Sequence, residues 1–251
     1  MAMPNIWACI LVGFVAQTID GALGMAYGVS CSTFLLSFGT APAIAVASVK
    51  ASEVFTTAIS GLAHLRLGNV DRKLLLQLLI PGVIGGMLGA YVLSSLPGEK
   101  IKPVVAFYLV IMGVVIIVKA FGKRPLRPLA EQKVVALGFF GGLLDALGGG
   151  GWGPIVTTTL IARGREPRMA IGSVNLSEFF VTLAQAATFV SMVGVRHGTV
   201  IVGLVVGGVI AAPFAAYLCR RIPPKILMVA VGVIIIALSI RNIAIAFLGG
   251  N

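Results

Sequence analysis

Long apolar runs dominate the chain and predict helices that cross a membrane. A spanning helix needs roughly 20 apolar residues, and six runs reach that length: 42–65, 74–96, 103–121, 169–193, 199–219 and 226–247. Two further stretches, 5–38 and 134–162, are too long for one ordinary span, and an acid with several glycines interrupts each near its middle. The pattern therefore predicts an all-α polytopic membrane protein with two broken helical elements.

The chain is also an internal duplication. Residues 13–57 align without gaps to 138–182 at a constant offset of 125, and 16 of the 45 positions are identical. The identical positions include the acid and glycines of each interruption and a second acid further on. We therefore predict three parts: repeat one (1–121), a basic cytoplasmic linker (122–130) and repeat two (131–251).

The positions of lysine and arginine indicate how the interrupted stretches cross. Cytoplasmic loops are enriched in these residues. If each stretch crosses once, the bases other than Lys50 divide 10 to 8 between the two sides; if the chain reverses at Asp20 and Asp145, they divide 14 to 4. The second split predicts that each half begins with a short broken or re-entrant helical hairpin, followed by three transmembrane helices. Each half then crosses an odd number of times, so the repeats have inverted topology and both termini lie outside the cytoplasm.

Composition narrows the functional classes. The chain is 58% hydrophobic and 11% charged, against roughly 25% charged residues in a soluble domain. Its net charge of +11 is explained by membrane topology, so we expect no nucleic-acid partner. The cysteines show no metal-binding or disulfide spacing, and the chain has no P-loop or HExxH motif. We therefore expect a protein of the lipid bilayer that is not an enzyme and has no cofactor or metal.

Four of the eight acids lie in predicted membrane segments, as the repeat-related pairs Asp20/Asp145 and Glu53/Glu178. A charge at such depth costs at least ~2.5–3.5 kcal/mol on insertion scales, so it indicates function by default. The alternative is structural, because a carboxylate at a hairpin tip also caps the neighbouring half-helix. Both interpretations stay open for the two aspartates.

Lys50 lies three residues before Glu53, on the same helix face. The repeat-related position is Asn175, beside Glu178. Lys50 either neutralises Glu53 in a packed interior or binds an anionic substrate. Half-helix N-termini near Gly24 and Gly149 would favour an anion. The remaining predicted site residues are Ser52, Ser177, Gly28 and Gly153.

The glycine-rich turns have a physical reason at membrane depth. A turn there survives only where protein covers it or it lines a wet cavity, and glycine permits a tight turn and a close approach. Inverted repeats with broken helices place a substrate site near the midplane, at the repeat interface. We expect both turns to meet there.

The duplicated turn D-G/A-x-x-G-x-x-x-G, at Asp20 and Asp145, is followed by S-x-K/N-x-S-E in both halves. This pattern resembles the sulfite exporter TauE/SafE family, over nearly the whole chain. The family comprises membrane permeases linked to sulfite, sulfonates and other small organic anions. The resemblance implies a permease for a small anion, such as sulfite or a small organosulfonate or carboxylate.

We therefore expect an alternating-access transporter in the cell (inner) membrane. Four ionised carboxylates would repel an anion, so either some are protonated or they carry protons for coupling. The rivals are a proton-coupled importer of another solute, an intramembrane aspartyl protease and a non-transporting assembly factor or sensor. Glycines at GxxxG spacing in 82–90 favour packing within the bundle over dimerisation, and a homodimer stays open.

Overall fold

The computed structural model describes residues 5–23, 25–122, 129–194, 198–218 and 224–248. The helices before the linker are α1 (Ile6–Leu23), α2 (Tyr27–Ser37), α3 (Pro42–Arg66), α4 (Arg72–Ser95) and α5 (Gly98–Ala120). Those after it are α6 (Glu131–Gly148), the π-helix η1 (Trp152–Thr157), α7 (Thr158–Ala162), α8 (Pro167–Val193), α9 (Gly198–Leu218) and α10 (Pro224–Leu248). The described residues contain no strand, which confirms the predicted all-helical class. Most of the predicted linker, 123–128, lies outside the described residues.

Local sequence explains where the regular helices begin. Pro42 and Pro167, which match across the repeats, are the first residues of α3 and α8. Proline suits the first helical position because its φ is preset and its missing N–H has no partner there anyway. Asp71 caps α4 by accepting hydrogen bonds from the backbone N–H groups of Lys73 (2.9 Å) and Leu74 (3.2 Å).

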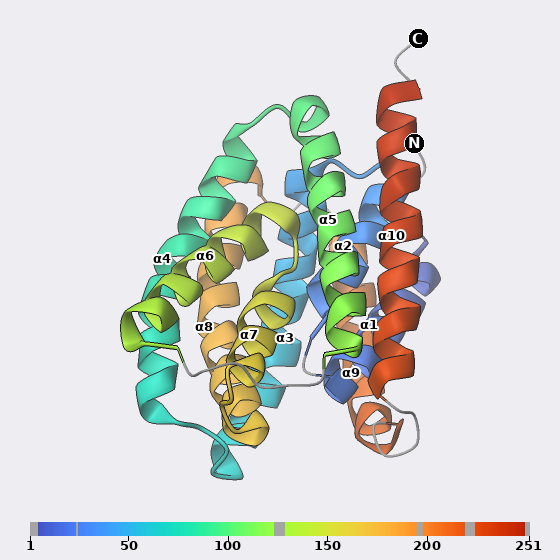
Figure 1. Ribbon diagram of the computed structural model, residues 1–251. Helices are drawn as coiled ribbons and strands as arrows, with labels where there is room; N and C mark the ends of the chain where they lie inside the picture. The colour runs from blue at the N-terminus through green and yellow to red at the C-terminus, as the bar shows by residue number, and fades with distance from the viewer. Residues whose placement is uncertain (1–4, 24, 123–128, 195–197, 219–223, 249–251) are drawn as a thin grey trace.

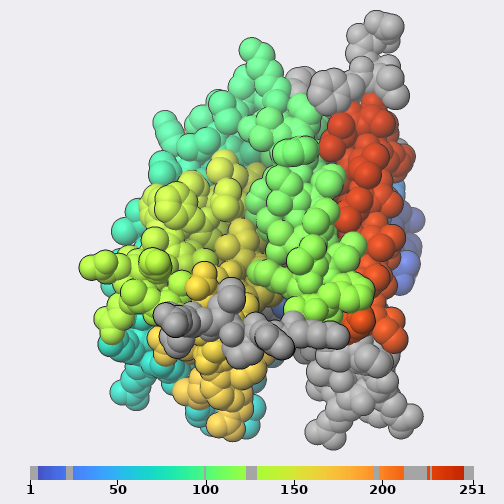
Figure 2. Space-filling model, viewed as in Figure 1, coloured from blue at the N-terminus to red at the C-terminus, as the bar shows by residue number. Residues whose placement is uncertain are grey.

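The two halves interlock reciprocally (Figure 1). Helix α1 of the first half packs against α9 of the second, and the related α6 packs against α4. Two further pairs join equivalent helices, α3 with α8 and α5 with α10, and α4 also packs against α8. Figure 2 shows the side chains of α5 and α10 closed against each other along one face. The core of the molecule is therefore the interface between its halves.

Equivalent helices run antiparallel. An added Cβ at Gly61, near the end of α3, would lie 3.1 Å from the Cα of Leu176, in the first half of α8. Gly172, near the start of α8, faces Asn69, which follows α3. Antiparallel packing is the arrangement that inverted repeats require, whereas repeats of the same orientation would place these helices parallel. The inverted topology itself stays a prediction.

Each half begins with a helical hairpin. In Figure 1 the chain climbs along α6, turns over and descends through η1 and α7. The first arms, α1 and α6, have 18 residues each, and α2 has 11. At 1.5 Å per residue these lengths are about 27 and 16 Å. The short arms therefore reach about half of a bilayer core of roughly 30 Å.

The turns of the two hairpins lie a few residues later than the sequence predicted. We predicted them at Asp20 and Asp145, but α1 continues to Leu23 and α6 to Gly148. In α6 the helix ends at Gly149, whose φ of 73° is in the left-handed region that favours glycine. Both aspartates therefore lie in the last turn of the first arm, facing the start of the second.

Among the described residues, five helices are long and apolar enough to cross a membrane: α3, α4, α8 and the segments Lys100–Ala120 and Met228–Ile245. The segment Gly198–Ala211 of α9 belongs to the shorter apolar helices. Large apolar side chains such as Trp7, Phe107 and Ile226 are exposed on the outside of the bundle. This surface suits contact with lipid.

The ends of the helices separate by charge. The junctions of α3 with α4 and of α7 with α8 lie at the lower end of Figure 1, and the junction of α4 with α5 lies at the top. The described bases at those lower junctions are Arg66, Arg72, Lys73, Arg163, Arg165 and Arg168, and those at the upper end are Lys100, Lys102 and Arg241. The separation agrees with a reversal in each hairpin, while the assignment of the lower end to the cytoplasm stays a prediction.

Glycines on α4 serve packing within the bundle. An added Cβ at Gly85 would lie 2.0 Å from the carbonyl oxygen of Phe139, and one at Gly89 would lie 2.5 Å from that of Leu143, both in α6. Gly86 faces the side chain of Gln185 in α8. These positions are therefore filled inside the chain, as the GxxxG spacing predicts.

Candidate functional site

The two hairpin tips meet in the centre of the molecule. An added Cβ at Gly28, at the start of α2, would lie 2.8 Å from the carbonyl oxygen of Gly149. The Ser32 hydroxyl donates to that same oxygen (2.6 Å), and the Tyr108 hydroxyl from α5 donates to the carbonyl of Gly150 (2.9 Å). The approach leaves no room for a side chain at Gly28, which explains the glycine.

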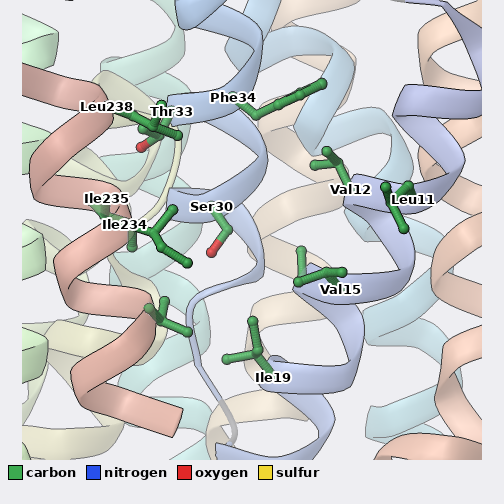
Figure 3. A pocket seen from close by; sticks show the side chains of 12 residues that line it. Leu11, Val12, Val15, Ile19, Ser30, Thr33, Phe34, Ile234, Ile235 and Leu238 are labelled. Carbon is green, nitrogen blue, oxygen red and sulfur yellow. The ribbon is translucent and has the colours of Figure 1, made fainter. Parts of the chain in front are cut away.

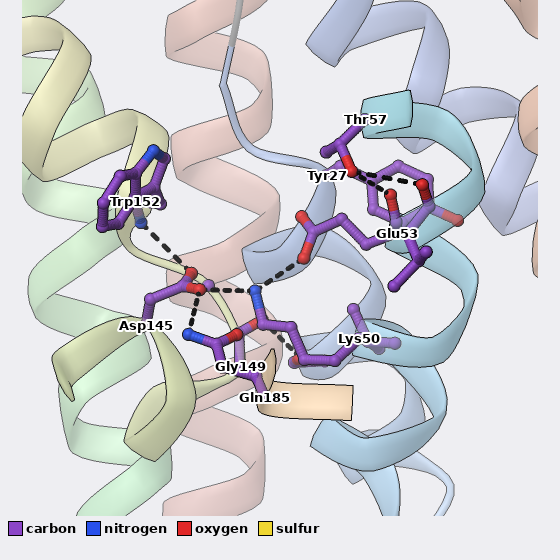
Figure 4. A network of polar contacts seen from close by, with 12 residues as sticks. Tyr27, Lys50, Glu53, Thr57, Asp145, Gly149, Trp152 and Gln185 are labelled. Carbon is purple, nitrogen blue, oxygen red and sulfur yellow. Dashed lines mark hydrogen bonds and ion pairs between the residues drawn. The ribbon is translucent and has the colours of Figure 1, made fainter. Parts of the chain in front are cut away.

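Lys50 lies at this meeting point and joins the halves (Figure 4). Its side chain is fully buried. Its ammonium Nζ is 2.6 Å from Glu53 Oε2, one helical turn along α3, and 2.7 Å from Asp145 Oδ2, in α6. The predicted Lys50–Glu53 pair is therefore present, and a second ion pair crosses the repeat interface.

Asp145 is satisfied from three directions. Besides Lys50, its Oδ2 accepts a hydrogen bond from Gln185 Nε2 (3.1 Å). Its Oδ1 accepts one from the backbone N–H of Trp152 (3.1 Å), the first residue of η1. Figure 4 shows these donors converging on the carboxylate. Cation and hydrogen-bond partners are what a buried carboxylate requires.

Asp20 repeats only part of this arrangement. Its Oδ1 lies 3.5 Å from the backbone N–H of Tyr27, the first residue of α2. Both aspartates thus face the N-terminus of the following arm, as the capping interpretation predicted. Among the described residues no base pairs with Asp20.

The second half lacks the cation of the first. Asn175, at the position related to Lys50, is buried but uncharged, and it is followed by Glu178. Glu178 has a relative exposure of 9%, and within the described chain its carboxylate has no hydrogen bond or ion pair. Glu53 and Asp145 are both paired with Lys50, whereas no described base pairs with Asp20 or Glu178.

The four acids line one small cavity. It has a volume of about 10 Å³, and its walls also include Tyr27–Val29 and Gly150–Pro154. That volume holds about one water-sized probe. The hairpin tips and the acids therefore surround a small polar space at the repeat interface.

The other predicted site residues are distributed as follows. Ser52 and Ser177 are buried and donate to carbonyls of their own helices, those of Val49 (2.7 Å) and Val174 (2.8 Å). Ser52 also accepts a hydrogen bond from the Tyr27 hydroxyl (3.2 Å). Gly28 and Gly153 line the cavity, and Gly149 is buried at its edge. Gly24 lies outside the described residues.

Sequence reasoning missed Ser32 and two further residues of the network. Gln185 follows Glu178 by seven residues, so both share a face of α8, and that spacing was a usable signal. Tyr108 lies on α5 with no matching spacing, and only the tertiary structure brings its hydroxyl to Gly150. Within the described chain, no cluster of three or more His, Cys, Asp or Glu residues could hold a metal ion.

A larger cavity lies apart from this network, between α1, α2 and α10 (Figure 3). It has a volume of about 220 Å³, and apolar side chains such as Val15, Phe34 and Ile235 make up most of its wall. Ser30 and Thr33 contribute hydroxyl groups. Its wall carries no charged residue, so it is a poor site for an ion.

Comparison with known proteins gives the family. A family model described as "Sulfite exporter TauE/SafE" matches residues 9–242. A Bacillus subtilis (strain 168) protein described as "Probable membrane transporter protein YtnM" is 42% identical over 250 residues, which cover 96% of this chain and 83% of that protein. No solved structure matches the chain significantly. Both descriptions are of transporters, not enzymes, and the helices suit a multi-pass membrane protein. The chain belongs to the sulfite exporter TauE/SafE family of membrane transporters.

Proposed function

We propose that this protein transports a small anion, either sulfite or a small organosulfonate or carboxylate, by alternating access at the repeat interface and with linkage to protons. The observation that carries the proposal is Lys50, the one fully buried base among the described residues, at the point where the two broken hairpins meet. The first residues of α2 and η1 line the same cavity. Their backbone N–H groups donate to Asp20 and Asp145, and the dipoles of the two helices favour an anion at this point.

The small size of the cavity supports a mechanism in which the site opens. The space has room for about one water-sized probe, whereas sulfite has four heavy atoms. Substrate entry therefore requires the hairpin tips to separate. Reciprocal packing of the halves provides two related ways to open, one toward each side of the membrane.

The membrane potential supports export of an anion. Because the cell interior is negative, one net negative charge that leaves the cell gains about 2.3 kcal/mol per 100 mV, and a dianion that leaves together with one proton carries such a charge. We place the protein in the cell (inner) membrane with both termini outside the cytoplasm, since the bases gather at one end of the bundle. A homodimer stays open.

The test is flux into proteoliposomes that contain the purified protein, with sulfite, a small sulfonate or a small carboxylate outside. We expect sulfite flux that responds to the pH gradient and falls at least about tenfold in Lys50→Ala, since losing a buried charge contact costs more than 1.4 kcal/mol. The control is Lys100→Ala, an exposed base at the end of the bundle, which should keep wild-type flux. No flux with any of the anions would contradict the proposal.

One alternative rests on a specific observation. Four acids line the cavity, and a single lysine pairs with two of them. This balance favours a proton-coupled importer of another small solute. Competition separates the two functions: amines would inhibit flux or binding under the alternative, and sulfite would do so under the proposal.

A further inference from the structure

The two repeats contain the same ionic arrangement with one cation missing. In the first, the Lys50 ammonium binds Glu53 (2.6 Å) and Asp145 (2.7 Å). The repeat-related residues are Asn175, Glu178 and Asp20. An asparagine amide is shorter than a lysine and carries no charge, so this second acid pair has no built-in counter-ion.

A second difference points the same way. Gln185 donates to Asp145 (3.1 Å), but the residue of repeat one that corresponds to Gln185 is Ser60, whose side chain is too short for that reach. Asp20 keeps only the 3.5 Å contact with the N–H of Tyr27. Of the two aspartates, one is held by three donors and the other by one.

Glu178 is the group that these differences leave without a partner. Its side chain is more than nine-tenths buried and lines the cavity. No hydrogen bond or ion pair reaches its carboxylate from the residues that the structure describes. A buried carboxylate is stable as an ion only with a cation or several donors, while the neutral acid needs neither.

The cation that replaces the missing lysine must be no larger than about a water molecule. The cavity is about 10 Å³, and across the described residues no group of three or more His, Cys, Asp or Glu could hold a metal ion. A proton needs only one carboxylate oxygen. We propose that Glu178, together with Asp20, is the exchangeable proton site of this transporter.

This assignment deepens the proposed function and rests on it for its role in transport. Glu178 takes a proton from one side as its carboxylate becomes a carboxylic acid, and returns the same proton to the other side. Each bound proton lowers the net negative charge around Lys50 by one, so the anion binds with the proton. The charged groups that face Glu178 are Asp20 on α1, Lys50 and Glu53 on α3, and Asp145 on α6.

The experiment follows the carboxyl groups directly, by infrared spectroscopy of the full chain reconstituted in lipid. As the pH is lowered, the wild type should gain a C=O absorption at the high frequency of a buried carboxylic acid without hydrogen bonds, which separates it from the bands of more exposed acids such as Asp71 and Glu131. Glu178→Gln should remove this band, and the matched variant Glu53→Gln should keep it. The proposal would be overturned if the band were absent from the wild type or persisted in Glu178→Gln. It would also be overturned if, at fixed pH, replacing choline with sodium changed the intensity of the band, because sodium would then occupy the site.

A second variant tests the missing cation and guards against misfolding of the first. Asn175→Lys places an ammonium at the position that corresponds to Lys50. We expect this variant to lose the titrating band and, in proteoliposomes, the dependence of flux on the pH gradient. Retention of both would count against the proposal. If the wild type moves none of the anions, the proposed function fails, while the infrared titration still decides whether Glu178 is the proton site.

Discussion

At the residue scale, Lys50 is the residue on which most charges of the site depend. Replacing it with methionine keeps much of the apolar stem and removes the ammonium that joins Glu53 to Asp145. Breaking a buried ion pair by removing one partner costs about 3–5 kcal/mol, because the other charge is left uncompensated. We expect Lys50→Met to lower the free energy of unfolding by that amount, measured by denaturation in detergent. Adding Glu53→Gln to Lys50→Met should recover part of the loss, and a single variant as stable as the wild type would contradict the ion-pair geometry.

The two aspartates provide a matched comparison at the same scale. Asp145 accepts from Lys50, Gln185 and a backbone N–H, whereas Asp20 has one long contact. We expect Asp145→Asn to destabilise the protein by about 3 kcal/mol and Asp20→Asn by about 1 kcal/mol or less. Unfolding curves of the two variants measure the difference. Equal losses would show that the repeats share one hydrogen-bonding pattern in the membrane.

At the element scale, the contact between α4 and α6 depends on glycines that let two backbones touch. In Gly85→Ala the new methyl would lie 2.0 Å from the carbonyl oxygen of Phe139, so the helices must separate. Overpacking of this kind costs about 1–3 kcal/mol, and we expect a lower midpoint of thermal unfolding. The control is Gly198→Ala, at the start of α9, where nothing lies within 4 Å of the added Cβ. A midpoint equal to that of the control would place α6 further from α4 than the structure does.

At the scale of the whole molecule, the ends of the helices predict how the chain lies in the membrane. Exposed bases occur at both ends of the bundle: Arg168 is the second residue of α8, and Lys100 lies near the start of α5. We expect a membrane-impermeant thiol reagent to label Lys100→Cys in intact cells and Arg168→Cys only after permeabilisation, because bases gather on the cytoplasmic side. The unmodified protein gives the background from its own cysteines. Labelling of Arg168→Cys in intact cells would invert the proposed orientation.

The sequence by itself determined the helical class, the two broken elements and the pairs of acids, since these are properties of runs, spacings and an internal match at a fixed offset. The charge count also indicated the reversal in each half, and the ribbon agrees with it. The short range of these signals is the reason that they can be read from one chain: apolar length, glycine content and flanking charge act within a few turns of the helix.

Only the tertiary structure decided which groups meet. Spacing along α3 predicts that Lys50 reaches Glu53, but nothing local predicts Asp145, 95 residues away, or the hydroxyl of Tyr108 at Gly150. The structure also places each turn after its aspartate, so that the carboxylate faces the next arm. These contacts depend on how two surfaces fit, and shape complementarity between distant segments is not written in the spacing of either one.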